Sequence, residues 1–433
     1  MRPVAAYLRS LDPQLPRSVW VLQAGGLANF FGNGVVIPFL IIYLHNVRGI
    51  SLTVAGLIAA TNSAVAIPSG ILAGALSDRL GAKRVLAAAL LVMAGSIALF
   101  PLITEAWHAF LLNGALGLGS GAFWPSQGAL LTALTPTHRR HAAFGLQRVT
   151  MNLGFGLGGL TGGLIATADS PSSFTVLFLV DAATFVAFAA LLMRLPSPPP
   201  HPHEEPGSYR NVLRNRPFMA FAWLNVAFIA AGVVLLSELL PVFVKNEAGV
   251  EESLIGVFFL VHTAAIVVAQ LPITKWSEGR RRMVALAAMA VLWGVAWLAV
   301  LAMGAWLHGE PAFGVLIGVG LVFALGACLH GTVGGPMVVD LAEPHVMGRY
   351  IAVSSLSWQI AFVVGPAAGG AVLDAQPLAL WPAAAAVLFA SAAASMALER
   401  RLPSHALRNP KAPLELPGAE AVPAPGIATR PSG

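Results

Sequence analysis

Charged side chains are scarce in this sequence: Asp, Glu, Lys and Arg together make up 10% of its 433 residues, against about 25% in soluble domains. A soluble protein of this length needs more charge to cover its surface, so the scarcity excludes a soluble multi-domain enzyme. Cysteine is almost absent as well. The single Cys328 excludes an intramolecular disulfide and a cysteine-based zinc cluster, and we expect neither a cofactor nor a metal.

Apolar residues dominate instead. They make up 57% of the chain, 44 further residues are glycine, and the mean hydropathy is +0.76. An apolar stretch of about 18 or more residues predicts a membrane-spanning helix, because lipid offers the backbone no other hydrogen-bond partners. Twelve stretches qualify: residues 19–45, 53–76, 85–104, 107–134, 143–167, 173–194, 217–244, 252–274, 283–305, 311–339, 349–373 and 378–399.

The basic residues lie on one side of these stretches. Of the 25 Lys and Arg residues, 22 fall in the N-terminus, in the loops after every second stretch and in the C-terminal tail. The other side has Arg48 and Lys245, and Arg148 lies inside the fifth stretch. Because cytoplasmic loops carry the excess of Lys and Arg, we expect a multi-pass protein of the cell membrane with both termini in the cytoplasm. A basic stripe interleaved with aromatic residues is missing, which excludes a nucleic-acid partner.

A proline-rich polar stretch from Leu195 to Tyr209 divides the chain. Such a stretch does not form a membrane helix. The halves carry related strings, since Gly158–Gly163 recurs as Gly365–Gly370 and Gly81–Arg84 as Gly279–Arg282. Repeated halves are typical of secondary transporters, whose substrate site lies between the repeats. We expect four parts: an N-terminal six-helix bundle (1–194), a cytoplasmic linker (195–216), a C-terminal six-helix bundle (217–400) and a disordered cytoplasmic tail (401–433).

The loop after the second stretch carries the most specific string, Gly74-Ala-Leu-Ser-Asp-Arg-Leu-Gly-Ala-Lys-Arg84. Gly81 permits a tight reversal, and Asp78 can cap a helix or pair with arginine. The string resembles the signature loop of the major facilitator superfamily. That resemblance implies an all-α membrane protein with twelve transmembrane helices in two pseudo-symmetric six-helix bundles. It also implies a conformational latch for the outward-open state, formed by Gly74, Asp78, Arg79, Gly81, Lys83 and Arg84. The related loop after the eighth stretch has Trp276 in place of the aspartate, so latching should differ between the halves.

The fifth stretch has glycines at spacings of four, which allow close helix contact in lipid. It also resembles the antiporter motif of the drug:proton exporters of that superfamily, with Gly159 where those proteins have proline. The eleventh stretch keeps that proline. Arg148 either replaces the arginine that such exporters carry in the fourth stretch, where this chain has Asn113, or reaches the cytoplasmic interface or Asp78. The motif residues are Arg148, Asn152, Gly154, Gly158, Gly162, Gly163, Gly365, Pro366, Gly369 and Gly370.

Ionisable residues within the stretches are candidates for coupling, because each costs roughly 2.5–3.5 kcal/mol at the bilayer centre. Four stand out: Glu238, His330, Asp181 and His262. The resemblance places the sixth stretch at the periphery and so favours a structural role for Asp181. Glu238 either forms a gate or reaches the outer water. Each histidine either titrates near neutral pH or is a hydrogen-bonded packing residue.

Neutral polar and aromatic residues in the remaining stretches are candidates for substrate contact. Many of them repeat every three or four residues, as on one face of a helix. Helix–helix hydrogen bonding is the alternative role for the amides. An aromatic and amide site without a fixed charge pair suits apolar or weakly cationic molecules. The set comprises Asn29, Phe30, Asn33, Trp124, Gln127, Asn225, Phe228, Trp358 and Gln359.

Together these features predict a monomeric secondary transporter in the lipid bilayer that exports small molecules by alternating access, with protons as the coupling ion. A facilitator that imports a nutrient is the alternative. A lipid-modifying membrane enzyme would need a nucleophile–base or metal cluster, and the sequence has no His-x-x-x-His or Gly-x-Ser-x-Gly string. A receptor that has lost transport is disfavoured by the complete loop around Asp78.

Overall fold

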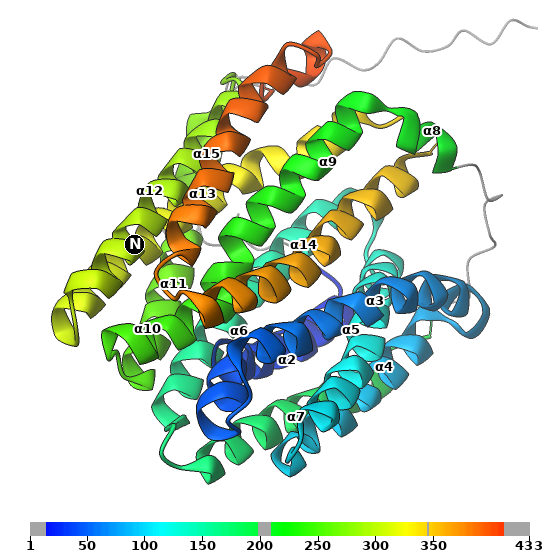
Figure 1. Cartoon of the computed structure of the whole chain (residues 1–433). Coiled ribbons are helices and arrows are strands. Elements are labelled where there is room, and N and C mark those ends of the chain that lie inside the picture. The colour runs from blue at the N-terminus through cyan, green and yellow to red at the C-terminus, as the bar shows by residue number, and fades with distance from the viewer. Residues whose placement is uncertain (1–13, 198–208, 344–345, 411–433) are drawn as a thin grey trace, which may run out of the picture.

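The computed structural model describes residues 14–197, 209–343 and 346–410, and within them the long elements are all helices (Figure 1). The first half contains α2 (Arg17–Ile42) with η1 (Tyr43–Val47), α3 (Leu52–Leu80), α4 (Ala82–Ala98), α5 (Ala106–Leu134), α6 (Arg140–Ile165) and α7 (Pro171–Met193). The second contains α8 (Tyr209–Arg214), α9 (Arg216–Phe228), η4 (Ile229–Leu239), α10 (Leu240–Ala248), α11 (Glu252–Ser277), α12 (Arg282–Trp306), α13 (Glu310–Leu341), α14 (Met347–Ala375) and α15 (Leu380–Glu399).

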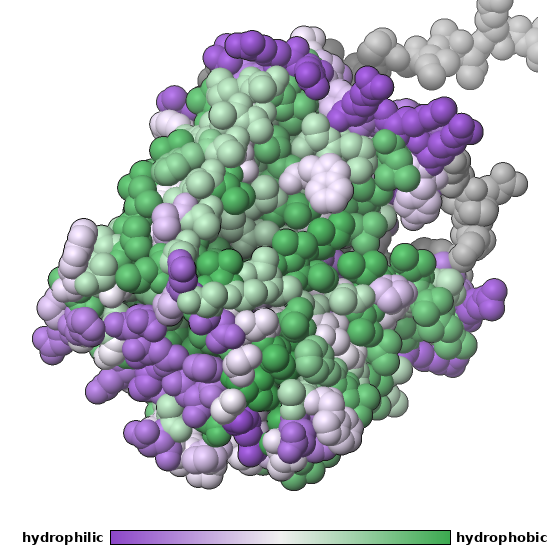
Figure 2. Space-filling model, viewed as in Figure 1, coloured by the Kyte–Doolittle hydropathy of each residue, from purple (hydrophilic) through white to green (hydrophobic). Residues whose placement is uncertain are grey.

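Since η1 continues α2, and η4 joins α9 to α10, the described residues form twelve long helical segments. They coincide with the twelve predicted stretches to within a few residues. Ten are both long and apolar enough to cross a membrane, and the exceptions are α5 and α6. Figure 2 shows the corresponding surface, with hydrophilic residues gathered at the two ends of the molecule and a largely hydrophobic face between them. The chain is thus a multi-pass membrane protein.

The segments pack as two bundles. In the first, α2 packs on α6 and α7, and α3 packs on α5; in the second, α12 packs on α13 and α15, and α14 packs on η4. Two helix pairs make most of the contact between the bundles, α3 with α14 and α6 with α11 (Figure 1), and α2 also meets η4 and α10. These pairs are related by the internal repeat, because α3 and α11 are each the second segment of a bundle, and α6 and α14 are each the fifth. The exact limits of the two domains stay a prediction.

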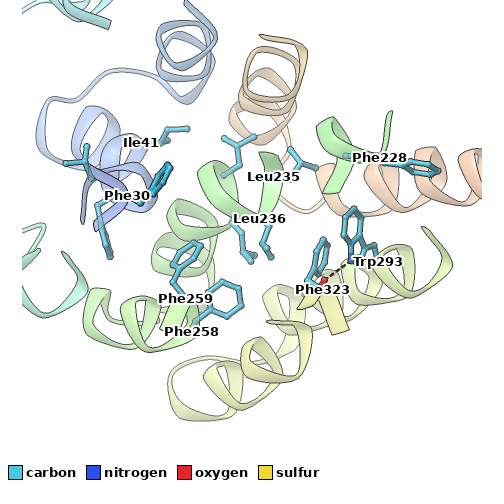
Figure 3. Packing of buried hydrophobic residues seen from close by; sticks show 14 of the residues in the cluster. Phe30, Ile41, Phe228, Leu235, Leu236, Phe258, Phe259, Trp293 and Phe323 are labelled. Carbon is cyan, nitrogen blue, oxygen red and sulfur yellow. Dashed lines mark hydrogen bonds between the residues drawn. The ribbon is translucent and has the colours of Figure 1, made fainter. Parts of the chain in front are cut away.

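Tryptophan packing fills the core of the second bundle (Figure 3). The Trp293 and Phe323 rings stack with centroids 5.1 Å apart, and the Trp293 Nε1–H donates to the Phe323 carbonyl oxygen at 3.1 Å. Gly326 lies against the same indole, so there is no room for a side chain there. The buried indole N–H is satisfied within the helix pair, as burial in lipid requires.

The loop between α3 and α4 reverses at Gly81, whose φ is +88°, and the loop between α11 and α12 reverses at Gly279, with φ +70°. Residues other than glycine rarely adopt this conformation. The predicted reversal at Gly81 is confirmed, and the repeat has a second reversal at the corresponding place.

Residues 401–410 are held against the second bundle, so the prediction of a disordered tail is wrong for them. Asn409 accepts a hydrogen bond from Arg282 Nε at 2.9 Å, and Arg281 and Arg408 form an antiparallel bridge. Arg282 is 1% exposed and also pairs with Asp340 at 2.6 Å. A buried guanidinium needs such partners, and the tail supplies some of them. Residues 411–433 lie outside the described part of the chain.

Candidate functional site

The interface between the bundles is closely packed at one end, which we call the sealed end. It is the end of the molecule that carries η1, the N-termini of α3 and α11, and the C-termini of α6 and α14. Gly56 of α3 lies directly against the Pro366 carbonyl of α14, and a Cβ added at Gly163 of α6 would lie 2.7 Å from Cα of Gly256 on α11. Because glycine has no side chain, the helix backbones touch at both of these symmetry-related contacts.

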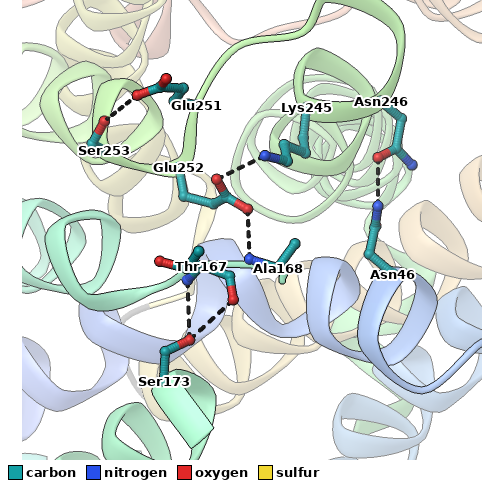
Figure 4. Close-up of polar contacts among 9 residues, drawn as sticks. All are labelled: Asn46, Thr167, Ala168, Ser173, Lys245, Asn246, Glu251, Glu252 and Ser253. Carbon is teal, nitrogen blue, oxygen red and sulfur yellow. Dashed lines mark hydrogen bonds and ion pairs between the residues drawn. The ribbon is translucent and has the colours of Figure 1, made fainter. Parts of the chain in front are cut away.

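A group of polar contacts reinforces the sealed end (Figure 4). Glu252 of α11 accepts hydrogen bonds from Lys245 Nζ at 2.8 Å and from the backbone N–H of Ala168, in the other bundle, at 3.0 Å. Asn46 Nδ2 donates to Asn246 Oδ1 at 2.7 Å, again across the bundles. Glu252 is 5% exposed. The Glu252 carboxylate is therefore largely shielded from water, whereas Lys245 stays partly exposed. Shielding strengthens the charge-assisted hydrogen bonds that Glu252 accepts.

Asp374 closes the opposite side of the sealed end. Its carboxylate, from the last turn of α14, accepts from the Leu52 N–H at 3.3 Å and from the Thr53 hydroxyl at 2.6 Å. The C-terminal bundle thus provides an acidic cap for the N-terminus of α3 in the other bundle, where a helix favours negative charge. Four hydrogen bonds between described residues thus join the bundles at the sealed end.

The other end, which we call the open end, is loosely packed. Gly74 of α3, Gly145 of α6 and Gly335 of α13 have no atom within 4 Å of the place where a Cβ would stand. Leu72 and Leu76 of α3 are 64% and 45% exposed. The open end carries the basic loops, and all six residues of the predicted latch lie there: Gly74, Asp78, Arg79, Gly81, Lys83 and Arg84. Lys83 donates to the Leu195 carbonyl oxygen at 2.6 Å, within its own half.

The glycines of the antiporter-like motif form two packing faces on α6. One face meets α2 of the same bundle, with Gly154 beside Phe30, Gly158 against the Phe31 carbonyl and Gly162 against Val35. The other meets α11 of the second bundle through Gly163. The eleventh predicted stretch, α14, repeats this arrangement: Gly365 and Gly369 meet η4, whereas Pro366 and Gly370 meet α3. Close helix packing is therefore one role of both motifs.

Arg148, at the start of that motif, points at the second bundle. Its Nη2 atom would lie 2.6 Å from a Cβ on Gly331 of α13, the residue that follows His330. No carboxylate among the described residues lies within ion-pair distance of Arg148, so the alternative in which it pairs with Asp78 is wrong. Asn152 donates to the Arg148 carbonyl oxygen at 2.8 Å and adds no charge.

Of the predicted contact residues in the first bundle, three lie together. The rings of Phe30 and Trp124 are 5.7 Å apart, and Gln127 accepts from Gln147 at 3.0 Å. Gln127 and Phe30 both lie beside Gly26. Trp124 is 49% exposed, so this group has a reachable aromatic face.

Asn29 lies apart from that group. It is 1% exposed, and on α2 it shares a face with Gly25 and Gly32, which pack on Phe188 and Asp181 of α7. Asn33 lies one turn further along α2 and is half-buried. Neither amide forms a hydrogen bond with another described side chain or backbone group.

In the second bundle, a hydrogen-bonded chain links three helices. His330 Nε2 donates to Asn225 Oδ1 at 2.8 Å, and Asn225 Nδ2 donates to the Ser357 hydroxyl at 2.7 Å. Trp358 meets the His330 ring edge-on at 6.1 Å, and Gln359 beside it is half-buried. Phe228 is 1% exposed and lies far from Phe30 (Figure 3), so it belongs to the core of its own bundle.

The other three coupling candidates have different surroundings. Asp181 of α7 is buried, and its carboxylate lies against Gly32 of α2. His262 Nδ1 donates to the Gly320 carbonyl oxygen at 2.9 Å and its ring stacks on Phe258, as expected of a packing residue. Glu238 lies in η4, an eleven-residue π-helix, and its buried Oε2 has no partner among the described residues. A π-helical stretch inside a longer helix frequently marks a functional site.

Sequence reasoning missed the residues of the sealed end and several amides of the interior. Glu252, Lys245 and Asp374 stand at the ends of apolar stretches, where charge is ordinary, so only their partners across the interface distinguish them. Gln147 and Gln270 stand among apolar residues and could have been found as polar residues within predicted membrane spans.

Comparisons with known proteins agree with this architecture. The profile of the Major Facilitator Superfamily matches residues 23–261 and 223–428. The chain is 26% identical over 370 residues to the multidrug resistance protein MdtH of Klebsiella pneumoniae, covering 82% of this chain and 89% of that protein. It is 24% identical over 369 residues to the uncharacterised MFS-type transporter YqjV of Bacillus subtilis, covering 82% and 86%.

Solved structures share the fold. One is a POT family transporter in complex with 5-aminolevulinic acid, with a TM-score of 0.73, 15% identity and coverage of 89% of this chain and 96% of that one. Another is a bacterial homologue of the human lysosomal transporter Spinster in an inward-facing, occupied conformation, with a TM-score of 0.70, 14% identity and coverage of 89% and 96%. With two bundles of six helices, a repeated pair of interface contacts and a family profile over most of its length, the chain belongs to the major facilitator superfamily and is a transporter.

Proposed function

We propose that this chain exports small, largely apolar molecules from the cytoplasm across the cell membrane by alternating access. The observation that carries the proposal is the contrast between the sealed end and the open end. The open end carries the basic loops, and basic loops face the cytoplasm, so this state corresponds to the inward-facing one, with both termini in the cytoplasm. Similarity to a multidrug resistance protein supports export. The proposal includes no enzymatic reaction and requires only one copy of the chain, which contains both bundles.

Aromatic residues with exposed faces support an apolar substrate. Trp124 in the first bundle and Trp358 in the second are 49% and 39% exposed, and each stands well inside a long helix, α5 and α14. Phe30, Gln127 and Asn225 lie beside them as neutral groups. Sites of this composition bind a molecule by apolar contact and orient it with a few polar groups.

The loop that contains Asp78 is proposed to act in the opposite state. In the outward-facing state the open end must close, and Gly74 and Gly81 leave space for another helix to approach the loop. Asp78, Arg79, Lys83 and Arg84 belong to this loop and would contact the second bundle in that state. The latch therefore stabilises the state opposite to the one described above.

Inward proton flow is proposed to drive export, with Glu238 as the carrier. Its carboxyl lies in the π-helix that packs on α14 and on α2 of the other bundle. A group at a moving interface can meet water on one side of the membrane in each state and so carry one proton per cycle. Asp181, His330 and His262 are the competing carriers.

Flux measurements in proteoliposomes test the proposal. The full chain is reconstituted, and the movement of neutral naphthyl, biphenyl and indolyl amides is followed with and without an imposed pH gradient. We expect flux toward the acidic compartment, which the gradient accelerates and Glu238→Gln uncouples. Asp181→Asn, His330→Gln and His262→Asn are the comparison variants.

The outcomes separate the alternatives. Flux that ignores the pH gradient contradicts proton coupling, and flux that follows the proton gradient in the same direction supports import by symport instead of export. Coupling lost in Asp181→Asn but kept in Glu238→Gln transfers the carrier role to Asp181.

A further inference from the structure

Arg148 brings a fixed positive charge to the interface between the bundles. It stands on α6, about two turns from the first residue of that helix, and its guanidinium crosses to α13 of the second bundle. The bare Cα of Gly331 makes room for it, because a Cβ at that position would stand 2.6 Å from Nη2. Arg148 is itself exposed in this state, so a molecule that enters from the open end can reach it.

The charge has no acidic partner in the described part of the chain. The ion pairs found there join Lys245 to Glu252, Arg281 to Glu399 and Arg282 to Asp340, all away from Arg148. Asp181 and Glu238, two acids that stand well inside their spans, have other surroundings and no ion pair with Arg148. A charged group inside a membrane protein is costly, and it persists where it pairs with another group or lines a substrate path.

The groups around Arg148 are neutral and polar. Gln270 of α11 also lies beside Gly331, since its buried Oε1 would lie 3.3 Å from the same Cβ, and this oxygen has no partner among the described residues. His330 is held by Asn225 and, through it, by Ser357. Trp358 adds an exposed aromatic face next to His330. The arrangement provides one cation, oriented polar groups and an apolar wall.

We propose that Arg148 is the anchor for a carboxylate on the transported molecule, whose apolar part lies toward Trp358. The planar guanidinium matches a carboxylate with two parallel hydrogen bonds, which an ammonium cannot do. This inference rests on the proposed function and narrows it, because a cationic molecule would meet a like charge. For this reason weakly cationic molecules, which the sequence also suggested, are not among the proposed substrates. Since Arg148 and Trp358 belong to different bundles, such a molecule contacts both.

Binding measurements on the purified full chain test this assignment. Matched pairs of probes differ only in charge: naphthalene-2-acetate and naphthalene-2-acetamide, biphenyl-4-acetate and its amide, indole-3-propionate and its amide. We expect the wild type to bind at least one carboxylate at least tenfold more tightly than its amide. Arg148→Gln should bring the two members of that pair within about twofold by weakening the carboxylate, and Arg148→Lys should be intermediate.

Arg400→Gln is the matched control, since it removes an exposed arginine at the end of α15 and should keep the full preference. The assignment is overturned if no pair shows a preference, if Arg148→Gln retains it, or if chloride or phosphate alone binds at Arg148 and the organic acids do not. Flux measurements separate this inference from the proposed function. If the carboxylate binds preferentially but no probe is transported, only the proposed export is contradicted. If amides are transported but no carboxylate preference is found, only the role of Arg148 as an anchor is contradicted.

Discussion

The two ends of the bundle interface differ in how they are held. At the sealed end, backbone touches backbone at Gly56 and Gly163, and buried or charge-assisted bonds from Glu252 and Asp374 cross between the bundles. At the open end, Gly74, Gly145 and Gly335 have empty space where a side chain would stand, and basic residues such as Lys83 and Arg282 have partners within their own half. The sealed end is thus closed by packing that leaves no room for an added atom. The open end has room to close, and it carries the charged loop between α3 and α4.

The comparison explains why both kinds of contact are needed. A transporter must break each closed end once per cycle, so neither closure can be too stable. Glycine contacts let the helices pack closely, and no side-chain entropy is lost on closure. Polar contacts fix how the helices are oriented, and they break readily when water enters because water replaces the lost partner. The following variants alter one end at a time, from the largest expected effect to the smallest.

Gly56→Leu should prevent closure of the sealed end. The added side chain would collide with the Pro366 carbonyl, which is backbone and cannot turn aside. We expect flux to fall by more than tenfold and the distance between spin labels at Ser172→Cys and Gln376→Cys to increase. Both label sites are exposed at the sealed end in different bundles, and native Cys328 is buried.

Gly95→Leu is the matched control, because Gly95 of α4 has no atom within 4 Å of its Cβ position. If Gly56→Leu gives the wild-type distance and flux, backbone contact is not what closes this end.

Glu252→Gln should weaken the sealed end without blocking it. The substitution removes a buried charge that binds Lys245 and the Ala168 N–H, at a cost of about 2 kcal/mol, or roughly thirtyfold in the balance of states. The label distance should then show a second, longer population. Exposed Glu251→Gln on the neighbouring position is the control, and an unchanged distribution in Glu252→Gln would contradict a role in closure.

Asp78→Asn should act at the open end alone. Loss of its charge is expected to destabilise the outward-facing state and to lower flux several-fold, while the label distance at the sealed end stays at its wild-type value. Insertion into the membrane should be normal. Wild-type flux in this variant would show that the loop is not a latch.

Much of the fold could be predicted from the sequence because its causes are local. Each apolar stretch is long enough to cross a membrane, and the described helices begin and end within a few residues of the predicted limits. The reversal at Gly81 follows from one residue type in a short charged loop. The glycine faces of the fifth and eleventh segments follow from spacing along one helix.

The site could be predicted less well, because a helix face has no fixed neighbour until the bundle forms. Asn29 and Phe30 are adjacent in the sequence, yet one faces α7 and the other Trp124. Phe228 fits the spacing of a substrate-contact face and is buried in its own bundle. The tail has a disorder-prone composition, but residues as far as Asn409 are held by Arg282.

The sequence by itself determined the number of membrane segments, the side that carries the basic loops and the repeat of the two halves, since composition and spacing within single segments decide these. Only the tertiary structure decided which end of the interface is closed and that Arg148 faces Gly331 rather than Asp78. The physical reason is distance along the chain: Arg148 and Gly331 meet because two bundles pack together, and no local pattern specifies that contact.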